Sequence, residues 1–213
     1  WNTGVAASGY TPNSWYTSAD ASAFHGHLDG DGHIVYGLYA NTTSNVSSAL
    51  FPKIQENNSE SIKNLGIESA FISVGYTGAA FVGETVSSWT AGTLTIENCF
   101  AGENVTVNAQ VAGVFYGRGG CKYTIRQCYS LASVTGITKW GMVAETWGSS
   151  RNIVNCYVVN TGITAHGYID CMNVCATDRM GGNGVVLLSD DNMQGLDVLT
   201  SDSKMKVLAS CDA

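Results

Sequence analysis

The chain has 213 residues, a formal net charge of −7 and only 10 Lys and Arg residues, which are scattered along it. This balance excludes the basic surface that nucleic acids or anionic membranes require, and no apolar run approaches the roughly 18 residues of a membrane span, so we expect neither a nucleic-acid partner nor membrane insertion. With 25 Gly, 2 Pro and 13% charged residues, the composition predicts one domain of many short strands joined by tight turns.

The first distinctive segment is HGHLDGDGH, residues 25–33, in which three His and two Asp occupy alternate positions. On one uninterrupted strand these side chains would share a face and could bind zinc or calcium. The two glycines instead favour a turn, which rotates His33 away from the other two His residues. An EF-hand loop does not fit either, because Ile34 stands where that loop needs Gly. We therefore predict a corner, in which the two Asp side chains bond turn amides, followed by a buried strand over 33–39.

An internal repeat organises the rest of the chain. The segment SIKNLG at 61–66 returns as TIENCF at 95–100, TIRQCY at 124–129 and NIVNCY at 152–157, at intervals of 34, 29 and 28 residues. A second element, Gly followed by small and apolar residues, keeps the same spacing, and a β-branched stretch lies between the two. Each period therefore holds three short candidate strands, too few for a propeller blade and without the helix of a βαβ unit. The pattern predicts an all-β, parallel β-helix with about 28–34 residues per coil.

In such a solenoid each strand pairs with its equivalents about 4.8 Å above and below, so equivalent residues stack in ladders. The repeat predicts two buried structural ladders, an aliphatic one of Ile62, Ile96, Ile125 and Ile153 and one of unpaired cysteines, Cys99, Cys128 and Cys156. The Asn or Gln before each Cys is expected at a bend in the left-handed conformation, with its amide bonded along the axis. Glu97 and Arg126 should be neighbours on the solvent side.

The seven cysteines form no C-x-x-C pair, which argues against a zinc ribbon or a thioredoxin-type site. Three stacked thiolates could hold a metal, but no His or carboxylate has the matching spacing. We expect the ladder cysteines to be small buried hydrophobic residues, and we expect no metal and no cofactor.

With the repeat laid out, the chain resembles the GLUG-repeat proteins, secreted or surface proteins of anaerobic gut and other bacteria. Their repeats read I-x-N-C-Y followed by G-G-L-V-G. The resemblance rests on pieces in the expected order: the opening from Phe24 to Tyr39, Ala-Leu-Phe at 49–51, the copy at 61–66, the three Cys-containing copies, and the segment 188–195. The G-G-L-V-G element is looser here, although small-then-apolar character is kept. The resemblance implies a right-handed parallel β-helix that serves as an adhesion or binding module of a larger surface protein.

Family members usually carry strand-forming sequence before the tryptophan that Trp1 resembles, so we expect a fragment of a longer chain, with the remainder of that chain as a partner. Near the C-terminus, Ser189 and Ser201 each precede acidic residues in the manner of a helix N-cap, which predicts a short helical cap over the last coil. We divide the single domain, 1–213, as follows: an irregular N-terminal segment at 1–23, coils at 24–175, and a C-terminal cap at 176–213.

Trp89, Trp140 and Trp147 lie in turn-rich or strand-end segments and are candidate platforms for sugar rings, although they could equally cover the ends of the core. Catalytic β-helices act on polysaccharides with clustered carboxylates, whereas the adjacent Asp190 and Asp191 would not face each other on a helix. We expect no catalytic residues. The predicted function is a non-catalytic, extracellular or cell-surface module of a bacterium that binds a glycan or a host or cell-surface protein. The alternatives are a passive stalk or spacer, or a lyase- or hydrolase-like β-helix.

Overall fold

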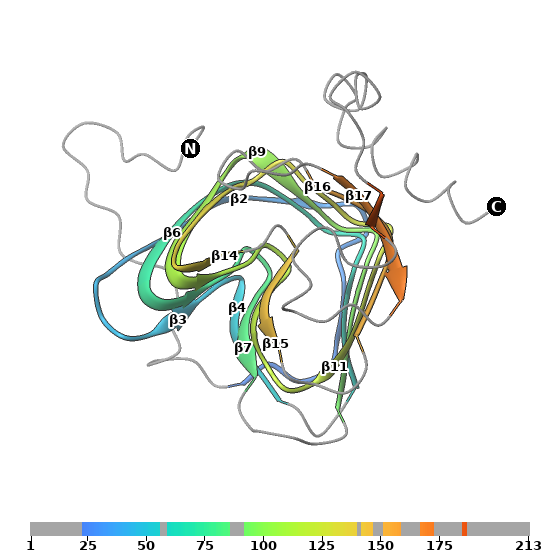
Figure 1. Cartoon of the computed structure of the whole chain (residues 1–213), viewed down its shortest axis with the longest axis horizontal. Coiled ribbons are helices and arrows are strands. Elements are labelled where there is room, and N and C mark those ends of the chain that lie inside the picture. Colours follow the sequence, from blue (N-terminus) through green and yellow to red (C-terminus); the bar gives the residue numbers. More distant parts are fainter. Residues whose placement is uncertain are drawn as a thin grey trace.

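The computed structural model describes residues 23–55, 59–85, 92–139, 142–146, 151–158, 167–172 and 185–186, and the statements below concern these residues. They form a β-solenoid, in which each coil lies against the equivalent segments of its neighbours, so that equivalent strands superpose when viewed down the stack (Figure 1). The predicted all-β, parallel β-helix is confirmed. Among these residues no helix is long and apolar enough to span a membrane.

The coils are built from stacks of parallel strands. One stack contains β1 (His27–Asp29), β5 (Ser59–Lys63), β8 (Thr93–Glu97), β11 (Lys122–Arg126) and the first part of β16 (Arg151–Val158). A second contains β2 (Ile34–Asn41), β3 (Ser47–Ser48), β6 (Gly66–Gly78), β9 (Phe100–Ala112), β12 (Tyr129–Ser130), β13 (Ser133–Thr135) and β14 (Thr138–Lys139). A separate four-stranded sheet contains β4 (Phe51–Ile54), β7 (Val82–Thr85), β10 (Tyr116–Gly119) and β15 (Val143–Thr146).

The aliphatic ladder runs through the first stack. Ile62 pairs with Ile96, Ile96 with Ile125, and Ile125 with Ile153, and none of the four is more than 4% exposed. Leu28 pairs with Ile62 and extends the ladder into the first described coil. Burying each of these side chains contributes about 1.5–3 kcal/mol, so the ladder is a main source of the solenoid's stability.

The bend after this stack is made by residues in the left-handed conformation, as the repeat predicted. Asn64, Asn98 and Gln127 have φ angles of 52°, 53° and 53°. The amide Nδ2 of Asn98 donates to Oδ1 of Asn64 at 2.8 Å, and Nδ2 of Asn64 donates to Oδ1 of Asp29 at 2.9 Å. The amide ladder therefore stabilises the bend along the axis and ends on a carboxylate in the first coil.

The cysteine ladder is buried and contains no disulfide: Cys99, Cys128 and Cys156 are free thiols with 0% exposure. Each sulfur contacts two backbone carbonyl oxygens, one from the residue two positions earlier and one from the preceding coil. Cys128 Sγ, for example, lies 3.1 Å from the Arg126 carbonyl oxygen and 3.6 Å from the Ile96 carbonyl oxygen. Burial raises the pKa of Cys128, and the hydrogen bonds and charges of the neighbouring thiols add to this effect. The ladder cysteines are therefore small buried side chains within the core.

An aromatic ladder follows the cysteines. The rings of Phe100 and Tyr129 stack with centroids 5.1 Å apart and planes 2° apart. Gly66 holds the equivalent position in the coil before, and a Cβ atom there would overlap the Phe100 ring. Glycine at this position therefore leaves room for the aromatic ring of the next coil.

The prediction of three short strands per coil is wrong for β6 and β9, which each run for 13 residues. They pair from Gly66 and Phe100 to Gly78 and Ala112, and the register shifts twice along the way. Such bulges bend a strand without ending it, so the chain turns the corner while it keeps its ladder of hydrogen bonds. The sequence pattern marks turn residues and misses bulges of this kind.

The two ends of the stack also differ from expectation. In β2, predicted as a buried strand, Leu38 is 2% exposed but Tyr36 is 59% exposed, because the register of β2 shifts on both sides of Tyr36. At the other end, β17 (Gly167–Met172) pairs antiparallel with β16, and β18 (Val185–Val186) antiparallel with β17. Parallel coils were expected up to residue 175, whereas the parallel pairing among the described residues ends at β16. The predicted N-terminal segment falls almost wholly outside the described residues, and the helical cap does so apart from β18.

Candidate functional site

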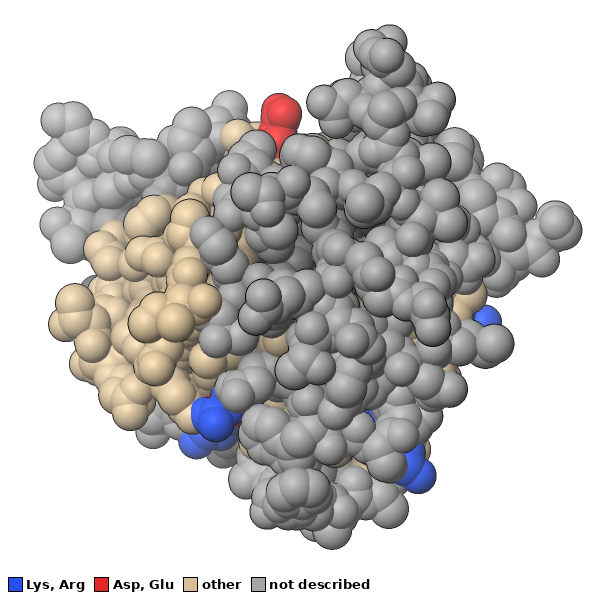
Figure 2. Space-filling model, in the orientation of Figure 1, with Lys and Arg blue, Asp and Glu red and all other residues tan. Residues whose placement is uncertain are grey.

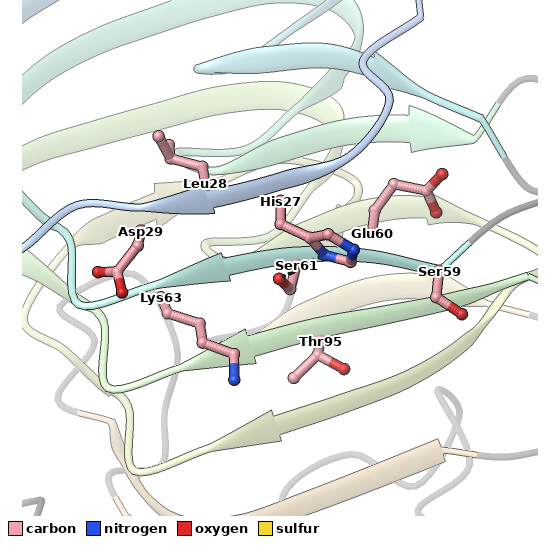
Figure 3. A pocket seen from close by; sticks show the side chains of 8 residues that line it. All are labelled: His27, Leu28, Asp29, Ser59, Glu60, Ser61, Lys63 and Thr95. Atoms are coloured by element: carbon pink, nitrogen blue, oxygen red, sulfur yellow. Dashed lines mark hydrogen bonds between the residues drawn. The ribbon is translucent and has the colours of Figure 1, made fainter.

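A surface pocket of about 450 Å³ lies where the first three strands of the first stack meet. We call it the β1–β5–β8 pocket, and it is lined by His27, Leu28, Asp29, Ser59, Glu60, Ser61, Lys63 and Thr95. Figure 3 shows Leu28 and Glu60 on one side of the strands and Lys63 and Thr95 on the other. The pocket is therefore formed both by outward-facing residues and by residues that point toward the core.

The segment 25–33, first considered as a metal site, supplies part of this pocket. His27 Nδ1 lies 2.9 Å from Ser61 Oγ, and His33 Nδ1 donates to the carbonyl of Gly30 at 2.8 Å. Asp29 Oδ1 accepts hydrogen bonds from Asn64 and from the backbone N–H of Asp31, both at 2.9 Å. The Asn64 bond and then the Asp31 bond are the main causes that hold the pKa of Asp29 below its ordinary value. Among the described residues, no three His, Cys, Asp or Glu side chains come together as a metal-binding group.

Glu60 is the unusual member of the pocket. It is 2% exposed and pairs with Leu94, a core residue with 0% exposure. Its Oε1 atom is buried and has no hydrogen-bond partner among the described residues. Burial raises the pKa of Glu60, and the charges of His25 and His27 counteract this only in part. A carboxyl group therefore occupies a position that the neighbouring coils fill with hydrophobic side chains.

Beside the pocket, three charged residues form one cluster. Glu97 Oε2 lies 2.9 Å from Lys63 Nζ, and Glu97 Oε1 contacts Arg126 Nη2. Burial acts to raise the pKa of Glu97, but the hydrogen bond and charge of Lys63 and the charge of Arg126 outweigh it, and the net shift is downward. The predicted Glu97–Arg126 contact is present, and Lys63 joins it from the preceding coil.

A second surface lies on the outside of the β2, β6, β9 and β13 stack. The half-buried rings of Tyr39 and Phe71 stack with centroids 5.7 Å apart, and Thr106 and Ser133 continue this row. A parallel row two positions later contains Asn41, Ser73, Asn108 and Thr135. We call these eight residues the Tyr39–Phe71 strip.

The polar row of the strip is internally bonded and faces solvent. Asn108 Nδ2 donates to Ser73 Oγ at 3.3 Å, and Thr135 Oγ1 donates to Asn108 Oδ1 at 3.1 Å. Asn41, Asn108 and Thr135 are exposed. The row thus holds hydroxyl and amide groups in fixed order beside an aromatic surface.

In Figure 2 the described Lys and Arg side chains lie apart near the rim of the face shown. Arg126 contacts Glu97, as the repeat predicted, and Arg118 lies over the Tyr76 ring, 4.9 Å from its centroid.

The predicted binding residues Trp89, Trp140 and Trp147 lie outside the described residues, and the candidate site above contains none of them. Glu60, Tyr39 and Phe71 are not among the functional residues that the sequence predicts. Glu60 carried a usable signal, because aligning the repeats places it with Leu94 and Tyr123, both of which are core residues. Comparisons of the chain with protein-family models, with curated proteins and with solved structures found no match.

Proposed function

We propose that the protein is a non-catalytic glycan-binding module of a larger bacterial surface or secreted protein, and that it acts outside the cell. The observation that carries this proposal is the Tyr39–Phe71 strip, where a stacked aromatic pair lies beside a row of polar side chains. The GLUG-repeat resemblance is part of the same proposal, since its repeats occur in adhesion and binding modules.

The chemistry of the strip suits a sugar chain. The C–H faces of sugar rings pack on aromatic faces, while hydroxyl groups need donors and acceptors at the edges. Asn side chains supply both donors and acceptors, and Thr and Ser hydroxyls do the same. Because successive strands lie about 4.8 Å apart, the strip repeats these groups at regular intervals along the solenoid axis.

The test is binding to oligosaccharides of cellulose, chitin, xylan and arabinan, measured by calorimetry with the wild-type chain and the double variant Tyr39→Ala/Phe71→Ala. We expect the double variant to lose at least about tenfold in affinity for the oligosaccharide that binds, which is about 1.4 kcal/mol. Ile137→Ala is the matched control, because Ile137 is a large hydrophobic residue with 84% exposure outside the strip. An unchanged affinity in the double variant would contradict the proposal, and no binding to any polymer would favour a passive spacer.

A further inference from the structure

Tyr36 is the one exposed aromatic residue in the part of the chain that the structure describes, with 59% of its surface accessible. It pairs in register with Ser69, which stands two residues before Phe71 on β6. Residues two apart on a strand share a face, and Phe71 lies on the outer face. The ring of Tyr36 is therefore next to the row of the strip that begins with Tyr39 and Phe71.

A bulge in β2 holds Tyr36 in this exposed position. The register of β2 against β6 shifts on both sides of Tyr36, and the next residue, Gly37, has a φ of 74°. Glycine adopts this conformation without strain, and bulges commonly redirect a side chain. The N–H of Gly37 donates to Ser69 Oγ at 2.9 Å, which ties the bulge to the next coil. The exposure of Tyr36 thus follows from the backbone of β2.

The aromatic part of this surface is confined to the first two coils. Tyr39 stacks on Phe71, and its hydroxyl group accepts a hydrogen bond from Nδ2 of Asn41 at 3.3 Å, so the ring is held from two sides. At the equivalent positions the third coil has Asn104 and Thr106 on β9, and neither is aromatic. The rings of the first two coils therefore form one aromatic cluster, which continues into a polar surface along the axis.

This surface is also without positive charge. The strands β2, β6, β9 and β13 contain no Lys or Arg, and their charged residues are Glu68 and Glu103. Each of these acids stands three residues before a member of the strip, and Glu103 is exposed. A ligand with carboxylate or sulfate groups would lose water without gaining a counter-charge, and would be repelled by both acids. The surface therefore suits an uncharged ligand.

We propose that Tyr36 is a third aromatic contact of the glycan, and that the strip binds an uncharged glycan segment across its first two coils. Sugar rings gain most from aromatic surfaces, and all three exposed or half-exposed rings of this face lie in these coils. This inference rests on the proposed function, because it names the class of glycan and the part of the strip that binds it.

The first experiment measures the affinity of single variants by calorimetry, with the oligosaccharides of cellulose, chitin, xylan and arabinan. We expect Tyr36→Ala to lose about fivefold in affinity for the oligosaccharide that binds, which is the scale of one aromatic contact. Tyr36→Phe keeps the ring and should bind as the wild-type chain does. Thr135→Ala is the matched control, because Thr135 is an exposed strip residue on β13, two coils beyond Phe71.

The second experiment tests the charge of the ligand. It compares a carboxymethyl and a hydroxyethyl derivative of the oligosaccharide that binds, which differ in charge but little in size. At low ionic strength we expect the carboxymethyl derivative to bind about fivefold more weakly, and the difference should shrink in Glu103→Gln and in high salt. Equal binding of the two derivatives by the wild-type chain would overturn the uncharged class.

The outcomes separate this inference from the proposed function. Unchanged affinity in Tyr36→Ala, together with a loss in Tyr39→Ala/Phe71→Ala, would overturn the inference and keep the strip. An equal loss in Thr135→Ala and Tyr36→Ala would also overturn it, since the glycan would then extend along the axis over all the coils. A loss in Tyr36→Ala with none in Tyr39→Ala/Phe71→Ala would overturn the strip. No binding by the wild-type chain would overturn both.

Discussion

Replacing Glu60 by Leu should stabilise the protein, although it removes a charged residue from a candidate binding pocket. The unpaired Oε1 atom costs about 1–3 kcal/mol, and the substitution removes this penalty. Leucine at this position would continue the buried row formed by Leu94 and Tyr123. Since the added side chain buries apolar surface as well, we expect a net gain of about 1–3 kcal/mol.

The assay is urea unfolding followed by circular dichroism, with the midpoint and the slope fitted separately, because a solenoid can lose two-state behaviour. For a chain of this size the expected gain corresponds to a rise in Tm of about 2–4 °C per kcal/mol. A loss of stability in Glu60→Leu would refute the reasoning, since it would mean that the carboxylate has a stabilising partner within the protein.

Four further predictions follow from the same contacts. The pKa of Glu60 is raised in the folded state, so ionising this carboxyl costs no stability below its ordinary value of 4.5, and the cost grows as the pH rises through the folded-state pKa. The advantage of Glu60→Leu should therefore grow with pH across that range in urea titrations. The pKa of Glu97 is lowered, so Glu97→Gln should cost about 1 kcal/mol of stability at neutral pH. This cost should shrink as the pH falls through the folded-state pKa of Glu97. A cost that does not change with pH would contradict the ion-pair account. Asn98→Ala should cost about 1–2 kcal/mol of stability, because the backbone of Asn98 is left-handed with a φ of 53°. Asn98→Gly should cost less, because glycine adopts this conformation without strain. Equal losses of the two variants in thermal unfolding would argue against backbone strain. Cys128 should resist alkylation in the folded chain and react on unfolding, as peptide mass spectrometry can show; rapid labelling of the folded protein would contradict its burial.

The repeat alone determined much of the solenoid, because the intervals between copies set which residues become neighbours. The ladder of Ile62, Ile96, Ile125 and Ile153 follows from aligning the copies, and the contact between Glu97 and Arg126 follows from the same alignment. The bend at Asn98 was also predictable, since Asn tolerates positive φ better than most residues.

The candidate surfaces, in contrast, depend on features that a linear pattern does not reveal. Tyr39 and Phe71 come together on the outside because bulges in β2 and β6 shift which residues face the core, and one shifted residue moves a side chain to the other face. The β1–β5–β8 pocket exists because parallel pairing brings His27, Ser61 and Thr95 side by side from three coils. The sequence by itself determined which residues stack, since stacking depends only on the repeat, whereas the tertiary structure decided where the stack bends and opens.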